Sequence, residues 1–312
     1  MADAASLHPR QPIVADIRQR DRSVNYPVPR NFSSRPVAVI GAGTLGRRIA
    51  LMFATRGGAV HIYDMSAPQR AAAVEYVAEN IAAAVARVEG GSAGISTACH
   101  DLNDAVAEAW LVVEAVPEKL ELKKQVFAQL DAATAEDTIL ASNSSSFPSR
   151  LFTSKVGHPE RVLNIHFYMP PDQSAVDIMS CGQTERSVMD FVKETLPLFG
   201  IYPFEAHKES IGFIFNRVWA AIKRECLELV AEGVSTPHDV DRMFQINTGM
   251  PGGPFRMMDQ VGLDVVLDIE KHYEAEHPEY PRGPRQLLEG YIADGRLGVK
   301  TGAGFYDDYP TP

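Results

Sequence analysis

Residues 37–46 read Val-Ala-Val-Ile-Gly-Ala-Gly-Thr-Leu-Gly, a short apolar run followed by three glycines at GxGxxG spacing. The apolar run predicts a buried strand, and the glycines predict a tight turn into a helix. Gly41 permits the turn, Gly43 lets the backbone approach a pyrophosphate, and Gly46 lets the helix pack closely on the sheet. The stretch therefore predicts the first βαβ unit of a dinucleotide-binding domain.

A second apolar run at residues 59–63 ends at Asp64. A carboxylate at the end of the second strand takes the ribose hydroxyls of a dinucleotide. The phosphates lie on the helix N-terminus, which here begins with Thr44 and Leu45. Because no Arg or Lys adjoins Asp64 in the sequence, the acid would repel a 2′-phosphate. The expected cofactor is therefore NAD rather than NADP. Read by itself, Asp64 could also serve only as a cap for the following helix.

Composition limits the class of partner. The 312 residues are 45% hydrophobic and 22% charged, with a formal net charge of -10. That length allows two domains with a sizeable core. The negative charge disfavours nucleic acid and anionic membrane surfaces as main partners. No apolar run approaches the roughly 20 residues of a membrane span. A small-molecule substrate is the expected partner.

The cysteines and the N-terminus bear on the compartment. Three cysteines, widely spaced, fit neither a disulfide framework nor a metal site, so we expect no metal and a reducing compartment. Residues 1–34 are rich in Pro and Arg and predict a poorly ordered extension. Three acids in this stretch, Asp3, Asp16 and Asp21, disfavour a transit peptide. Cytoplasmic localisation is therefore expected ahead of mitochondrial.

The remaining chain predicts two domains. Over residues 35–206 short apolar runs alternate with helical patterns, which is typical of a doubly wound parallel sheet. Expected strands lie at residues 37–40, 60–63, 110–114, 138–141, 162–166 and 201–204. Over residues 207–312 strand signals stop, and residues 211–230 predict one long helix that is apolar almost all round. We expect a Rossmann domain, then an all-helical domain that dimerises, with a cleft between them.

Six segments carry a resemblance that covers nearly everything from residue 37 to residue 306. They are Val112 to Glu118, Ala141 to Ser146, His166 to Tyr168, Gly212 to Arg217, Gly253 to Asp264 and Lys300 to Tyr306. In this order they resemble the 3-hydroxyacyl-CoA dehydrogenase family. The resemblance implies reversible NAD-dependent oxidation of a secondary alcohol beta to an acyl carbonyl.

The resemblance implies that His166 is the general acid/base, because hydride leaves carbon only as a proton leaves oxygen. A single histidine after Leu163-Asn164-Ile165 is otherwise more typical of a core residue. The family's glutamate that orients this histidine falls on Asp177 if one loop residue is deleted. An aspartate reaches one methylene less far, so the dyad would be weaker. Asp177 could instead be an outward-facing polar residue of a strand.

The other site residues implied by the resemblance are polar. Ser145 and Asn216 match residues that hydrogen-bond the substrate oxygen, where charge develops. Ser145 by itself could be a helix cap, whereas an amide such as Asn216 is costly in an apolar helix unless paired. Glu118 and Lys123 match residues near the nicotinamide, although they could be a loop acid and a solvated lysine. Asn143 and Ser145 are also expected at the cofactor.

The chain departs from the family pattern at two places. Met169 stands where the family has an asparagine, so one hydrogen bond to cofactor or substrate is missing. No lysine lies between Asp64 and Lys119, where family members place cations near the CoA nucleotide, and only Arg70 and Arg87 are basic there. CoA phosphates need cationic partners. The substrate is therefore either a 3-hydroxyacyl-CoA or, slightly favoured, a CoA-free hydroxy acid or related carbonyl compound. A catalytically decayed NAD-binding protein with a structural or sensing role is a further alternative.

Overall fold

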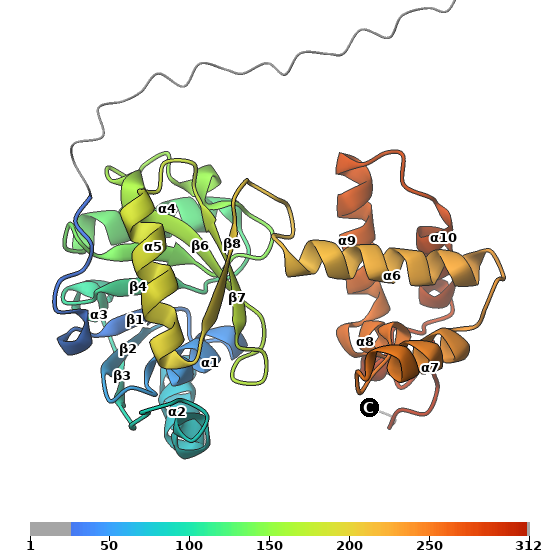
Figure 1. Ribbon diagram of the computed structural model, residues 1–312, viewed down its shortest axis with the longest axis horizontal. Coiled ribbons are helices and arrows are strands. Elements are labelled where there is room, and N and C mark those ends of the chain that lie inside the picture. Colours follow the sequence, from blue (N-terminus) through green and yellow to red (C-terminus); the bar gives the residue numbers. More distant parts are fainter. Residues whose placement is uncertain (1–25, 311–312) are drawn as a thin grey trace, which may run out of the picture.

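Eight strands form one sheet in the computed structural model, which describes residues 26–310 (Figure 1). The spatial order is β3-β2-β1-β4-β5-β6-β7-β8. Strands β1 to β6 are parallel, β7 is antiparallel to β6, and β8 is parallel to β7. The bounds are β1 (Val37–Ile40), β2 (Ala59–Tyr63), β3 (Ile95–Cys99), β4 (Leu111–Glu114), β5 (Ile139–Ser142), β6 (Val162–Phe167), β7 (Ala175–Ser180) and β8 (Tyr202–Ala206).

Helices cover the sheet and build the C-terminal domain. Five belong to the sheet domain: α1 (Thr44–Phe53), α2 (Ala67–Val85), α3 (Leu102–Val106), α4 (Leu120–Ala133) and α5 (Arg186–Thr195). Five follow it: α6 (Phe215–Ala231), α7 (Pro237–Thr248), α8 (Pro254–Val261), α9 (Leu263–Glu276) and α10 (Gly283–Ala293). Short 3-10 turns lie at Phe32–Ser34, Ser149–Phe152, Pro159–Arg161, Leu196–Phe199 and Val299–Thr301.

Alternate side chains of the central strands enter two cores. Val37 and Val39 of β1 pack into the core under α1, α2 and α5, whereas Ala38 and Ile40 pack into the core under α3 and α4. Helices therefore cover both faces, because each buried parallel strand has an apolar side chain on either side. The predicted doubly wound Rossmann sheet followed by a helical domain is confirmed.

Two strands were missing from the prediction, for different reasons. The edge strand β3 contains Ser96 and Thr97 and is only partly buried, so no apolar run marks it. Strand β7 is buried, but Asp177 interrupts its apolar sequence. The long helix also begins later than predicted, at Phe215, because Gly212 and Phe213 have positive φ values of 74° and 53°. These conformations cannot continue a right-handed helix.

The predicted N-terminal extension lies outside the described residues except for residues 26–34. This segment packs on the sheet domain: the Phe32 ring meets those of Trp110 and Phe191 edge-on, with centroids 5.5 Å apart in both pairs. Aromatic edge contacts of this kind add to the free energy of burial. The packed part of the sheet domain therefore begins upstream of residue 35.

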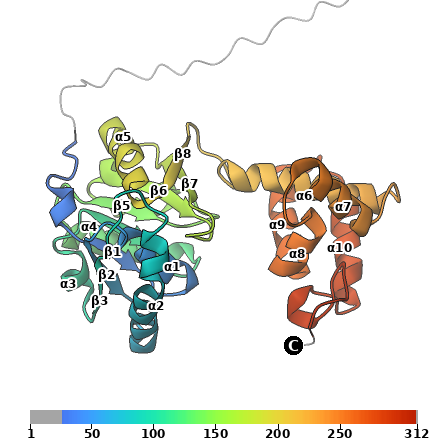
Figure 2. The same cartoon turned by 60° about the horizontal axis from the view of Figure 1, so that its bottom comes forward.

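A separate core holds the helical domain together. It includes Leu227 of α6, Phe255 and Met258 of α8, and Leu263 and Val266 of α9. Figures 1 and 2 show α6 leaving the sheet domain and running along the helical domain. Its first turn therefore remains beside the strands, where it contributes to the site described next. No helix within residues 26–310 has the length and apolar character needed to span a bilayer.

Candidate active site

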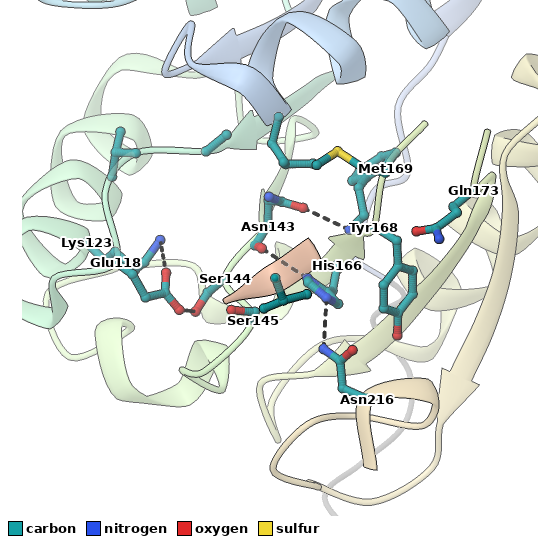
Figure 3. Close-up of a pocket in the computed structure, with 15 residues that line it drawn as sticks. Glu118, Lys123, Asn143, Ser144, Ser145, His166, Tyr168, Met169, Gln173 and Asn216 are labelled. Atoms are coloured by element: carbon teal, nitrogen blue, oxygen red, sulfur yellow. Dashed lines mark hydrogen bonds and ion pairs between the residues drawn. The ribbon is translucent and has the colours of Figure 1, made fainter. Parts of the chain in front are cut away.

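The carboxyl ends of the parallel strands meet at one edge of the sheet, where ligands bind in doubly wound folds. A cavity of about 560 Å³ opens there and is shown in Figure 3. The residues that line it include predicted cofactor and substrate contacts from both domains: Leu45, Glu118, Lys123, Asn143, Ser145, His166 and Asn216. The fold thus brings these predicted site residues together around one space.

The glycine loop fits a dinucleotide pyrophosphate. Gly41 has φ 104°, and a Cβ there would lie 2.5 Å from the Ala115 carbonyl oxygen. A Cβ on Gly46 would lie 1.8 Å from the Gly41 carbonyl oxygen, so only glycine allows α1 to approach β1 so closely. A Cβ on Gly43, by contrast, would point into open space with nothing within 4 Å. This open space adjoins the first amides of α1, which begins at Thr44 and is capped by no side chain.

Asp64 closes the same loop. Its Oδ2 accepts a hydrogen bond from the Ala42 amide at 2.8 Å, and its Oδ1 accepts one from the Ser66 amide at 2.8 Å. Arg70 of α2 approaches the backbone of Asp64, where Nη1 donates to the carbonyl oxygen at 2.5 Å. The carboxylate itself forms no ion pair among the described residues. It therefore keeps its negative charge facing the cofactor loop, as sequence predicted for a ribose-binding acid.

A buried ionic network forms one wall of the cavity. Lys123, which is 1% exposed, donates from Nζ to Glu114 at 2.8 Å and to Glu118 at 3.1 Å. Glu118 also accepts hydrogen bonds from the Ser144 hydroxyl and, at 3.0 Å, from the Ser146 amide. Burial would raise the pKa of Glu118, but Lys123 and these hydrogen bonds outweigh it and lower the pKa. Lys123 is thus a buried ion-pair partner and not a solvated helix lysine.

Sequence reasoning missed Glu114. Its side chain is fully buried and accepts from Lys123, from the Ser142 hydroxyl at 2.6 Å and from the Val116 amide at 2.8 Å. A carboxylate buried to this degree is costly unless all its lone pairs are used. The available signal was an acid at the end of the otherwise apolar run Leu111-Val112-Val113.

His166 lies in β6 with both ring nitrogens in contact with protein. Nδ1 is 3.3 Å from the Asn143 carbonyl oxygen, and Nε2 is 3.3 Å from the Asn216 amide nitrogen. A carbonyl only accepts, so Nδ1 carries the proton and Nε2 accepts from Asn216. The Phe213 ring stacks on the imidazole at 5.2 Å and 11°. Asn143 is held in turn by its Oδ1, which accepts from the Phe167 amide at 2.8 Å.

Burial lowers the pKa of His166 below its ordinary value of 6.5. The Asn143 carbonyl and the charges of Asp177 and Glu118 act in the opposite direction without cancelling the shift. The imidazole is therefore neutral near pH 7, with the unprotonated Nε2 facing the cavity. This is the form that can accept a proton from an alcohol.

The predicted direct dyad between Asp177 and His166 is not formed. The two residues are register partners across β6 and β7, so their side chains share one face of the sheet. Asp177 instead accepts a hydrogen bond from the Tyr168 hydroxyl, and burial together with this bond raises the pKa of Tyr168. The shorter aspartate leaves the Nδ1 position to the Asn143 carbonyl. Tyr168, whose ring centroid is 4.8 Å from that of His166, was not predicted.

The remaining predicted residues differ in placement. Ser145 is exposed in the loop after β5 and lines the cavity with its hydroxyl 3.5 Å from that of Ser146, so it is free to contact a ligand. Met169 lines the cavity and is 42% exposed. Asp177 lines a second, more apolar cavity of about 530 Å³, which shares Tyr168 and Gln173 with the first. No group of three His, Cys, Asp or Glu side chains within residues 26–310 is placed to hold a metal.

Two family descriptions match consecutive parts of the chain. Residues 36–209 match "3-hydroxyacyl-CoA dehydrogenase, NAD binding domain", and residues 212–308 match its "C-terminal domain". The chain belongs to the 3-hydroxyacyl-CoA dehydrogenase family. It is accordingly an NAD-dependent oxidoreductase that acts on CH–OH groups, as the resemblance implied.

Individual members of the 3-hydroxyacyl-CoA dehydrogenase family are about equally similar. The chain is 30% identical to 5-formyl-3-hydroxy-2-methylpyridine 4-carboxylate 5-dehydrogenase of Mesorhizobium japonicum, over 87% of this chain and 90% of that protein. It is 31% identical to human mitochondrial hydroxyacyl-coenzyme A dehydrogenase, over 86% and 90%. A solved diketoreductase structure, described with catalysis of dicarbonyl compounds, aligns with a TM-score of 0.74 and 32% identity over 88% and 98%.

The two loop glycines of this dehydrogenase should respond differently to the same substitution. We expect Gly43→Ala to fold normally and to lose NADH affinity, because the added methyl occupies the space that the pyrophosphate needs. Gly46→Ala should lower the melting temperature, because its Cβ would overlap the Gly41 carbonyl. Calorimetry and NADH fluorescence titration measure the two effects. Normal NADH affinity in Gly43→Ala would contradict the placement of the pyrophosphate.

The lowered pKa of His166 predicts the pH dependence of alcohol oxidation. The rate should fall only when the pH drops below a pKa that lies under 6.5, because the base must be neutral. Asp177→Asn removes a charge that raises this pKa, so the acid limb should move to still lower pH. The profile of kcat/KM with saturating NAD measures both. An acid limb that moves upward in Asp177→Asn would exclude the charge effect.

Proposed function

We propose that His166 is the general acid/base in the NAD-dependent interconversion of a 3-hydroxy and a 3-oxo compound. The observation that carries this proposal is the neutral imidazole with its free Nε2 lone pair directed at the cavity next to the glycine loop. In oxidation Nε2 accepts the hydroxyl proton, and in reduction the imidazolium returns it. NAD, when bound, accepts the hydride from the same carbon.

Ser145 and Asn216 would hold the substrate oxygen beside His166. The Asn216 amide donates to Nε2 at 3.3 Å, a long bond that a substrate hydroxyl can replace. The amide and the Ser145 hydroxyl can then donate to the oxygen as it becomes an alkoxide or a carbonyl. Donors placed where negative charge develops stabilise the transition state. Asn216 comes from the first turn of α6, so this step needs both domains.

Asp177 would support His166 at a distance. Its charge raises the pKa of the imidazole, and its hydrogen bond with Tyr168 positions the phenol ring against the imidazole edge. The proposed role is therefore to favour the imidazolium as it forms, and to fix the ring that lies between the two cavities. Glu118, Lys123 and Asn143 would shape the nicotinamide end of the site, since all three line the cavity.

The substrate is either a CoA thioester or a CoA-free compound, and we retain the slight preference for the latter. Relatives of both kinds are equally similar: the human protein is named for hydroxyacyl-CoA, and the Mesorhizobium protein for a pyridine carboxylate. Helix α2 contains only Arg70 as a basic residue, and that side chain is already bonded to Asp64 and His100. A buried, neutral His166 argues against the alternative of a catalytically decayed protein.

The helical domain, residues 207–312 of the predicted organisation, is proposed to join two copies of the chain. It exposes apolar side chains on successive helices: Val218 (53%), Met243 (64%), Ile246 (65%) and Val265 (42%). Exposed apolar area of this kind is typical of an interface. The three cysteines are free thiols, which supports the proposed cytoplasmic localisation.

His166→Ala should lower turnover by roughly 100-fold or more and leave NADH affinity near normal, the usual scale for loss of a general acid/base. Turnover is measured as NADH oxidation with acetoacetyl-CoA, acetoacetate and ethyl acetoacetate. A matched control is His61→Ala, since His61 lies in β2 with its ring bonded to the Ala105 carbonyl. Turnover that survives in His166→Ala would contradict the proposed role.

We expect sedimentation to show a species of twice the 34.2 kDa chain mass. Met243→Glu should dissociate it, because a charge in an apolar interface must be desolvated. Ile95→Glu serves as a control, because Ile95 is equally apolar and 72% exposed but lies on the sheet domain. A monomer that does not change with protein concentration would rule out the proposed dimer.

A further inference from the structure

Two adjacent arginines, Arg47 and Arg48, follow the last glycine of the cofactor loop on α1. Both guanidinium groups lie over the ring of Tyr76 on α2, with Cζ 4.9 Å and 5.8 Å from the ring centroid. Arginine planes stacked on one aromatic ring are held in place, because the ring's quadrupole attracts each cation. The two charges are therefore fixed side by side in the groove between α1 and α2.

Neither charge is neutralised within residues 26–310. No carboxylate lies within ion-pair distance of Arg47 or Arg48, and the Nε atom of each is buried without a hydrogen-bond partner. Nearby arginines differ: Arg87 pairs with Asp172 at 3.0 Å, and Arg70 is bonded to Asp64 and His100. Two like charges held together in a chain of net charge -10 are unfavourable unless an anion binds between them.

The pair lies beside the catalytic cavity. Arg48 Nη1 donates to the Pro170 carbonyl oxygen at 2.8 Å, which places its guanidinium on the loop between β6 and β7. The neighbours of Pro170 on this loop, Met169 and Gln173, line the cavity around His166. Leu45 lines it too, and Arg48 lies on the same side of α1, three residues further along. A ligand that leaves the cavity over this loop meets the arginines.

We infer that Arg47 and Arg48 form an oxyanion subsite for the part of the substrate remote from the reacting carbon. The subsite would take a carboxylate or phosphate, because guanidinium forks pair with the oxygens of either group in a bidentate manner. This inference rests on the proposed function for the identity of the reacting end. It assigns the anionic end by geometry and charge.

The anion has two possible sources. In a CoA-free substrate it is a carboxylate of the acid itself, and in a thioester it is a phosphate of the nucleotide. The arginines supply on α1 the cations that α2 lacks, so they restore a phosphate contact if CoA is the substrate. Because an ester of a CoA-free acid carries no such charge, its binding does not depend on the pair in either case.

The test compares the wild-type enzyme with the double variant Arg47→Met, Arg48→Met in reduction by saturating NADH. The substrates are acetoacetate, 3-oxoadipate, their ethyl esters and acetoacetyl-CoA. We expect the KM of one charged class to rise by about tenfold or more, as for loss of charge-assisted hydrogen bonds. The kcat and the KM of the esters should stay the same. An effect on the free acids indicates a carboxylate, and an effect confined to acetoacetyl-CoA indicates a phosphate.

Two further variants control for charge and for folding. Arg186→Met removes the same charge from α5, where Arg186 pairs with Asp190 and Glu205, and should leave every KM unchanged. Arg47→Lys, Arg48→Lys keeps the charges without the forks and should recover part of the lost affinity. Equal KM increases for acids and esters, or no increase for any charged substrate, would overturn the subsite. Loss of NADH affinity in the Met variant would instead assign the arginines to the cofactor.

A binding measurement keeps the inference separate from the proposed function. If no compound is turned over, the melting temperature of the NADH-loaded protein is measured with 3-oxoadipate and with inorganic phosphate. The wild type should be stabilised more than the Met variant by at least one of them, since binding to the folded state raises its stability. Identical shifts in both proteins would exclude the anion site, whatever the enzyme's activity.

Discussion

The buried carboxylate of Glu114 is the constraint on which the geometry of the site depends. It has no exposure, so all of its oxygen lone pairs must find partners inside the protein. Those partners fix β5 through Ser142, and α4 through Lys123. Lys123 then holds Glu118, which orders the serine-rich loop after β5. One charge at the end of β4 thus sets the wall against which the nicotinamide end of the site is built.

The histidine depends on the same strand ends. Asn143, the residue after β5, accepts from Nδ1 of His166 with its carbonyl and from the Phe167 amide with its side chain. Because this carbonyl occupies Nδ1, the carboxylate of Asp177 is not needed to choose the tautomer and can bind Tyr168. The exchange of a longer acid for aspartate is therefore accompanied by a new phenol partner. The pKa of His166 is set mainly by its burial and only modified by the carboxylates around it.

The substrate side of the cavity is less constrained than the cofactor side. Ser145 is exposed, Met169 offers no hydrogen bond, and Tyr168 opens onto an apolar space lined by Phe204 and Phe215. Beyond the loop the charge becomes positive at Arg47 and Arg48. This combination of a fixed proton acceptor, an apolar neighbour and a cationic edge favours a molecule with a polar reacting carbon and a separate anionic end.

Sequence by itself determined the nucleotide half of this protein. The GxGxxG run, Asp64 and the alternation of apolar runs with helices follow from local steric and periodic rules, and the structure has the predicted Rossmann sheet and helical domain. It also identified His166 and Asn216, although they lie fifty residues apart. Only the tertiary structure placed Lys123 between two glutamates, paired Asp177 with Tyr168 and left Arg47 and Arg48 without a carboxylate. Such pairings join distant strands and helices, so their geometry depends on side-chain reach across the fold and on which polar groups burial forces together.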